Sequence, residues 1–136
     1  YYGDEIGMSG GGSGEDWRGG MIWDETRQNQ KLLDLCKKLI SIRKTQSVMT
    51  NGDFTTVHAD PRSNTYAYLR HHDDKRILIA INNSPETQHI TIQNEKTGFP
   101  PELVLTDLLG EDKHKTSDGE IRLLLKPYSG VILSEH

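Results

Sequence analysis

The chain has 136 residues, a formal net charge of -4 and a hydrophobic fraction of 33%. This length suits one domain with an additional segment, and the acidic balance offers no basic surface for nucleic acid or anionic lipid. No apolar run approaches the roughly 20 residues that span a bilayer, so we expect neither a nucleic-acid partner nor a membrane. The single cysteine, Cys36, cannot form an internal disulfide and is expected to fill space on a helix face.

The first stretch is Tyr1-Tyr2-Gly3-Asp4-Glu5-Ile6-Gly7-Met8. Two aromatic residues suit a pleated, half-buried strand, and the Gly-Asp pair that follows breaks a strand where the backbone turns. We therefore expect the end of a buried strand that belongs to a larger structure.

Residues 9–20 are rich in glycine, which forfeits extra backbone entropy on ordering and does not hold regular structure alone. Alone, the segment is typical of a flexible linker. A phosphate-binding loop is disfavoured because no Gly-Lys-Ser/Thr follows. As an active-site loop it makes more sense, since glycines let the backbone approach a sugar while Trp17 and Arg18 offer a stacking face and hydrogen-bond donors. Trp17 packing beneath the loop is an equally good interpretation.

A helix is predicted from about Arg27 to Lys44. Apolar residues recur there at the spacing of one broad buried stripe, namely Leu32, Leu33, Leu35, Cys36, Leu39, Ile40 and Ile42. Asp24 or Thr26 can cap its start, and basic residues crowd its end, which suits the helix dipole. Something must cover the stripe, so we expect it to pack on the following domain, on a second copy of the chain, or on both.

From Val48 onward the apolar period changes from helical to two. Asn-Gly, Asp-Pro, Ser-Pro and Asp-Gly pairs punctuate the predicted strands, which are 53–58, 65–71, 76–82, 89–93, 103–108, 121–126 and 128–134. Many short strands separated in this way indicate a mainly β fold, an antiparallel Greek-key β-sandwich. The strand 76–82 is apolar on both faces and should therefore be central.

The clustered polar residues predict no metal site and no cofactor. In His71-His72-Asp73-Asp74 the two histidines would point to opposite faces of a strand, and Asp-Asp is ordinary turn chemistry. The segment around Ser129 lacks the Gly-x-Ser-x-Gly pattern of a hydrolase nucleophile.

The opening octapeptide resembles the α-amylase family of glycoside hydrolases, together with Gly10-Gly11, Met21-Ile22-Trp23-Asp24 and the helix that ends Leu39-Ile40-Ser41-Ile42-Arg43-Lys44. The neopullulanase, cyclomaltodextrinase and maltogenic amylase group is the most similar. Beyond residue 44 the resemblance is looser and rests on the strand pattern and on the run from Pro127 to Leu133.

The resemblance implies two parts. Residues 1–47 correspond to a remnant of a (β/α)8 barrel, comprising its eighth strand end, an active-site loop and its last helix, and residues 48–136 to a C-terminal β-sandwich. It also implies that both catalytic carboxylates lie upstream, so that no catalytic residue is expected in this chain. The adjacent Asp4 and Glu5 would point apart on a strand end and cannot flank one glycosidic bond.

Candidate substrate-binding residues follow from the same resemblance. Arg18 matches a sugar-contacting arginine of the neopullulanase group by its distance to Met21-Ile22-Trp23. The acidic partner of that pattern is not matched, and either Glu15 or Asp16 would have to replace it. Trp17 and Asp4 complete the candidate set.

The expected function is therefore that of the C-terminal portion of a retaining hydrolase acting on α-1,4-glucans, cyclodextrins or pullulan. The fragment alone is expected to be inactive, and the parent enzyme to be cytoplasmic. The alternative is a self-standing carbohydrate-binding or structural sandwich, for which Tyr66 and Tyr68 on one strand face are the candidate platform. We also expect the isolated chain to form homo-oligomers through the helix stripe.

Overall fold

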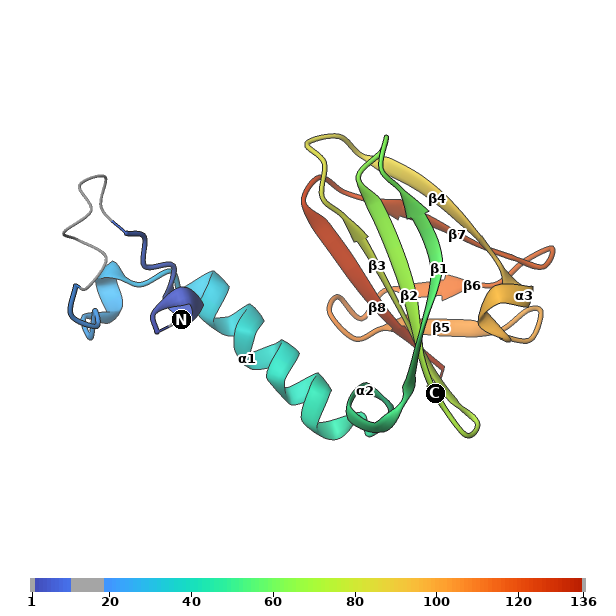
Figure 1. Ribbon diagram of the computed structural model, residues 1–136, viewed down its shortest axis with the longest axis horizontal. Coiled ribbons are helices and arrows are strands. Elements are labelled where there is room, and N and C mark those ends of the chain that lie inside the picture. Colours follow the sequence, from blue (N-terminus) through green and yellow to red (C-terminus); the bar gives the residue numbers. More distant parts are fainter. Residues whose placement is uncertain (1, 11–18, 136) are drawn as a thin grey trace. The chain divides into compact units, whose positions relative to one another are not determined.

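The computed structural model describes residues 2–10 and 19–135 of the chain (Figure 1). It divides into two units, Tyr1–Arg43 and Lys44–His136. No helix in the described ranges is both long and apolar enough to cross a lipid bilayer.

The first unit opens with a turn instead of the expected strand end. Tyr2 lies in this turn, and a 3-10 helix, η1 (Asp4–Ile6), follows it. The backbone of a strand needs a neighbouring strand to satisfy its hydrogen bonds, and the described residues before Asp53 include none. The segment instead satisfies its polar groups locally, since Met8 N donates to Gly3 O at 2.9 Å.

The amphipathic helix α1 (Gln30–Thr45) is confirmed, but it begins three residues later than predicted. Asp24 caps a separate 3-10 helix, η3 (Glu25–Arg27), by accepting from Thr26 N at 3.0 Å. Asn29 then caps α1, because its side-chain oxygen accepts from Leu32 N at 3.1 Å. Asp24 and Asn29 are thus both capping residues, and the apolar periodicity alone does not show at which of them the long helix begins.

The second unit contains the sandwich and two helical turns. Its elements are α2 (Val48–Asn51), β1 (Asp53–Asp60), β2 (Thr65–His72), β3 (Lys75–Asn82), β4 (Gln88–Gln93), α3 (Asn94–Thr97), β5 (Val104–Asp107), β6 (Lys113–Lys115), β7 (Glu120–Leu125) and β8 (Ser129–Ser134). All seven predicted strands are present to within two residues at either end. The change from a helical period was placed at Val48, but residues 48–51 form a further helical turn, and none of α2, α3 and β6 was predicted.

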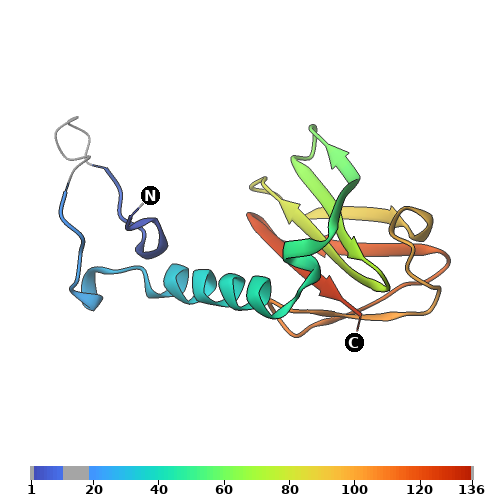
Figure 2. The same ribbon diagram turned by 60° about the horizontal axis from the view of Figure 1, so that its bottom comes forward.

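The strands form two antiparallel sheets. The first has the order β1-β2-β3-β8-β5-β6 and the second consists of β4 and β7. Strand β3 lies between β2 and β8, as its apolar character on both faces predicted. Figure 2 shows the same strands turned by 60°, with α2 lying beside the first sheet. The mainly β, antiparallel sandwich expected from the sequence is confirmed.

The core lies between the two sheets. Alternate residues of each strand point into it, as a period of two requires. The largest fully buried side chains include Leu78, Ile92, Leu105, Ile121, Leu125 and Leu133. This alternation leaves each sheet with one outward face, and the two outward faces carry different chemistry.

A buried carboxylate fixes the end of β5. Asp107 is 5% exposed, and its side chain accepts from Leu109 N at 3.0 Å, Gly110 N at 3.2 Å and Ile132 N at 3.0 Å. Backbone donors of this kind repay the cost of burying the charge. The β5–β6 turn is thereby tied to the last strand.

Candidate functional site

The turn at residues 2–8 depends on two glycines with positive φ, Gly3 at 86° and Gly7 at 73°. A side chain at Gly3 would also collide with Met8, because an added Cβ would lie 2.3 Å from the Met8 sulfur. Ile6 is buried, and its carbonyl accepts from Asn29 N at 2.9 Å. The turn is thus docked on the residue that caps α1.

Asp4 is the one candidate substrate-binding residue that lies within the described ranges. It is exposed in η1. Its neighbour Glu5 accepts a hydrogen bond from Gly3 N at 3.1 Å, so that carboxylate has a local structural role. The two acids occupy consecutive positions of a 3-10 turn, an arrangement that does not place carboxyl groups on opposite sides of a sugar ring.

The other four candidates, Glu15, Asp16, Trp17 and Arg18, lie outside the described residues. The positions that flank them are nevertheless joined, because the Tyr2 hydroxyl donates to Gly19 O at 2.9 Å. Gln28 holds the following segment by donating from its side chain to Ile22 O at 2.8 Å. Trp23 is 81% exposed.

Among the residues that the structure describes, three carboxylates have a pKa below the ordinary range. The Thr26 hydroxyl and backbone N–H lower the pKa of Asp24, the Arg62 backbone N–H and the Ser63 hydroxyl lower the pKa of Asp60, and Gln93 and Arg122 lower the pKa of Glu120. Each hydrogen bond favours the ionised form. A general acid needs the opposite shift, so these three groups act as local turn and strand anchors.

An aromatic patch lies on the outward face of the larger sheet. It consists of Phe54, Tyr66, Tyr68 and Ile81. The rings of Phe54 and Tyr68 stack with centroids 4.7 Å apart, and those of Tyr66 and Tyr68 lie 5.9 Å apart. Phe54 is 53% and Ile81 41% exposed, and the Tyr66 hydroxyl lies 2.8 Å from the Thr56 hydroxyl.

The sequence placed Tyr66 and Tyr68 on one face but did not find the rest of the patch. Strand β1 has a bulge between Thr56 and His58, which shifts the pairing with β2 by one residue. The face on which Phe54 lies therefore depends on a register that sequence periodicity does not reveal. With the observed register, Phe54 pairs with Arg70 and joins the tyrosines.

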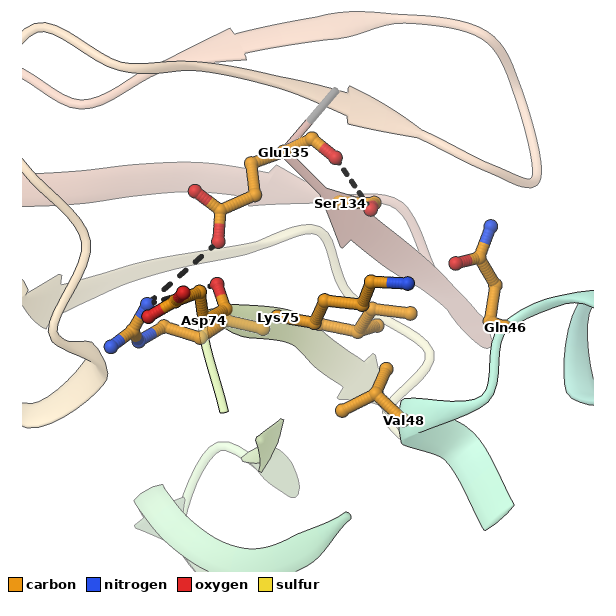
Figure 3. A pocket seen from close by; sticks show the side chains of 8 residues that line it. Gln46, Val48, Asp74, Lys75, Ser134 and Glu135 are labelled. Carbon is orange, nitrogen blue, oxygen red and sulfur yellow. Dashed lines mark hydrogen bonds and ion pairs between the residues drawn. The ribbon is translucent and has the colours of Figure 1, made fainter. Parts of the chain in front are cut away.

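A pocket of about 340 Å³ opens near the start of β3 (Figure 3). Its lining is mixed, with the charged Lys75, Arg76 and Glu135 beside the apolar Val48 and Ile77. Arg76 Nη1 lies 3.9 Å from Glu135 Oε1, and Ser134 Oγ donates to Glu135 O at 2.9 Å. No sequence signal links these positions, because residues 46–48, 74–77 and 134–135 are far apart along the chain.

The two histidines of β2, His71 and His72, are not arranged as the ligands of one metal ion. His71 Nε2 lies 3.3 Å from the Thr55 hydroxyl, and His72 Nε2 lies 3.7 Å from Asp73 on the adjoining turn. Across residues 2–10 and 19–135, no three His, Cys, Asp or Glu side chains gather closely enough to hold an ion.

Comparison with known proteins decides the family. Residues 54–132 match the protein family described as maltogenic amylase, C-terminal domain. The chain belongs to this family. The resemblance to α-amylase-type enzymes seen in the sequence is thereby confirmed, and the maltogenic amylase C-terminal domain coincides with the strands β1 to β8.

Similar proteins extend the match to nearly the whole chain. Neopullulanase 2 of Thermoactinomyces vulgaris is 38% identical over 133 residues, which are 98% of this chain and 22% of that protein. Cyclomaltodextrinase of Thermoanaerobacter pseudethanolicus is also 38% identical over 133 residues, 98% of this chain and 21% of that protein. The chain therefore spans about a fifth of the length of the curated relatives that it matches.

Among solved structures, an α-amylase from Geobacillus thermoleovorans in complex with acarbose superposes with a TM-score of 0.86 and 28% identity. The match covers 100% of this chain and 29% of that one. The segment before the maltogenic amylase C-terminal domain thus has a counterpart in the same proteins.

Proposed function

We propose that this chain is the C-terminal part of an α-amylase-type glycoside hydrolase and that its sandwich supports the catalytic barrel. One observation carries the proposal: relatives named for neopullulanase and cyclomaltodextrinase activity match 98% of this chain with 22% and 21% of their own length. The remaining length of such relatives is ample for a barrel of roughly 250 residues.

In the proposed enzyme the substrate is an α-1,4-glucan, a cyclodextrin or pullulan. A nucleophile and an acid in the preceding part of the polypeptide cleave the glycosidic bond with retention, which requires carboxyl groups about 5 Å apart. Residues 1–47 complete the barrel, and residues 48–136 form the supporting domain. The candidate substrate contacts in that enzyme are Arg18 as a hydrogen-bond donor, either Glu15 or Asp16 as its acidic partner, and Trp17 and Asp4.

A chimera tests this proposal. The matched 133-residue segment of the Thermoanaerobacter pseudethanolicus cyclomaltodextrinase is replaced by this chain, and hydrolysis of cyclomaltodextrin is measured by release of reducing sugar. We expect the chimera to be soluble and active, the host lacking the segment to be inactive, and this chain alone to release no sugar. An inactive but folded chimera, or sugar release by the chain alone, would contradict the proposal.

The alternative, a self-standing carbohydrate-binding sandwich, rests on the tyrosines of the aromatic patch. A sugar-binding platform presents free ring faces. Here Phe54 and Tyr68 use a face of each ring to stack on one another, and the Tyr66 hydroxyl is engaged by Thr56. These contacts favour a packing surface over a glucan platform.

The proposal includes a cytoplasmic location for the parent enzyme. Its small-molecule partner is the glucan or cyclodextrin substrate, and neither nucleic acid nor membrane is required for activity. Fractionation of cells that produce the enzyme, followed by the cyclomaltodextrin assay on each fraction, tests the location.

A further inference from the structure

The two outward faces of the sandwich differ in chemistry. On the smaller sheet, β4 and β7 present polar side chains, and Glu120 accepts from Gln93 Nε2 at 2.9 Å and from Arg122 Nε at 3.0 Å. Leu124, which is 57% exposed, is the large apolar residue on this face. On the larger sheet the aromatic patch of Phe54, Tyr66, Tyr68 and Ile81 is uncharged. A sheet face of hydrogen-bonded polar side chains is stable in contact with water, whereas a contiguous apolar face indicates a site where another protein surface packs.

The outward face of the larger sheet is already covered at one end. Helix α2 packs on β2 and β3, where Val48 is 2% exposed and its carbonyl accepts from Arg70 Nε at 3.4 Å. On the same face of β3, Ile77 and Ile79 are 1% and 5% exposed, while Ile81, two positions further along, is 41% exposed. The patch is the part of this face that α2 does not reach.

Helix α2 is also the point at which the preceding polypeptide enters the sandwich. The chain enters β1 directly after α2, and α2 packs on the same sheet face that carries the patch. The relatives have about four-fifths of their length outside the matched region. Because the matching family is a C-terminal domain, that length precedes this region in them.

We propose that the aromatic patch is the surface on which the preceding part of the same enzyme polypeptide packs. The inference rests on the proposed function and names the face that performs the supporting role. The occupant is a protein surface of uncharged, apolar side chains, because the patch offers rings and an isoleucine and no ion pair. Tyr66 and Tyr68 contribute ring edges to this contact, and Phe54 and Ile81 contribute the exposed apolar area.

The chain supplies a matched control for the test. Phe54 and Leu124 are 53% and 57% exposed but lie on opposite outward faces. The patch variant Phe54→Ser/Ile81→Ser and the control variant Leu124→Ser are each placed in the isolated chain and in the cyclomaltodextrinase chimera. In the isolated chain we expect each variant to lower the melting temperature by no more than a few degrees, since substitutions at partly exposed positions change stability little.

Limited proteolysis of the chimera provides the deciding measurement. We expect the patch variant to release the sandwich as a separate fragment at least about tenfold faster than the unmodified chimera, because burial of one large apolar side chain contributes that much or more. The control variant should release it at the unmodified rate. Equal rates for the patch and control variants would overturn the proposal.

Two further measurements on the isolated chain identify rival occupants. A tyrosine fluorescence change with maltoheptaose that the patch variant abolishes would assign the patch to glucan. A dimer in light scattering that the patch variant dissociates would assign it to a second copy. Either result overturns the inference. If the unmodified chimera is inactive, the proposed function fails, whereas the comparison of proteolysis rates tests the packing surface independently of activity.

Discussion

At the scale of single residues, Asn82 shows how one polar side chain joins the two sheets. It is 1% exposed at the end of β3. Its amide group donates to Glu86 O at 2.7 Å, Leu125 O at 3.2 Å and Lys126 O at 2.9 Å, and its oxygen accepts from Ser84 N at 3.0 Å and Ser84 Oγ at 2.8 Å. The end of β3 is thereby connected to the end of β7 in the other sheet.

We expect Asn82→Ala to lower the free energy of unfolding by about 2 to 4 kcal/mol, because several buried carbonyl and N–H groups lose their partner at once. Urea denaturation followed by circular dichroism measures the change. Asn83→Ala at the next position, which is exposed, serves as the control and should shift the midpoint little. Coincident unfolding curves for the two variants would show that the Asn82 network contributes nothing to stability.

At the scale of elements, β3 is the strand on which the larger sheet depends. Leu78 and Ala80 on its inward face are both 0% exposed, and they lie in the core that the two sheets enclose. The strand pairs along its whole length with β2 and over six residues with β8. A loss of packing at the centre of β3 should therefore destabilise both β2 and β8.

The substitution Leu78→Ala is expected to cost about 3 kcal/mol of unfolding free energy, since it leaves a cavity in a closely packed core. The same substitution at Leu124, which is 57% exposed, removes the same atoms without creating a cavity and should cost less than about 0.5 kcal/mol. Chemical denaturation of both variants tests the difference. Similar costs at the two positions would mean that the inward and outward faces have been assigned incorrectly.

The strands were predictable because each is short and bounded by strong turn residues, and because most of them, unlike the central β3, alternate in polarity. The four-residue helices α2 and α3 were not, since four residues are too few to establish a helical period. Helix α3 ends at Gly98, which has a φ of 68° and donates to Asn94 O at 2.7 Å, yet in the sequence that glycine indicates only a turn. Strand β6 is three residues long, Lys-His-Lys, and has no apolar position by which to recognise it.

The candidate site was less predictable than the fold. Asp4 was expected at a strand end but lies in a 3-10 helix, whose conformation depends on the Gly3 and Gly7 backbone angles. The aromatic patch depends on the β1 bulge, and the pocket beside β3 depends on contact between three segments that are distant in sequence. Pairing register and long-range contacts are tertiary properties, which local patterns do not contain.

At the scale of the whole molecule, α1 presents apolar side chains to solvent. Leu35, Leu39 and Ile40 are 44%, 39% and 54% exposed. Their burial against protein would be favourable by about 1.5 to 3 kcal/mol for each fully buried side chain. A chain that exposes such a stripe is prone to associate.

We therefore expect the isolated chain to have a solution mass above that of a 15.4 kDa monomer when measured by light scattering at micromolar concentration. Leu39→Lys/Ile40→Lys should return it to the monomer mass, because two charges cannot be buried without partners. The patch variant Phe54→Ser/Ile81→Ser should leave the mass unchanged. A monomeric wild-type chain would contradict the prediction.

The position of β8 in the larger sheet determines when that sheet can form during synthesis. β8 follows all other strands in sequence but lies between β3 and β5. On the ribosome, the β1–β3 and β5–β6 portions therefore emerge as two separate pieces with unpaired inner edges, and only the final strand joins them. Nascent chains halted before residue 129 would expose strand edges that invite aggregation, so the domain must complete its folding after its last strand has left the exit tunnel.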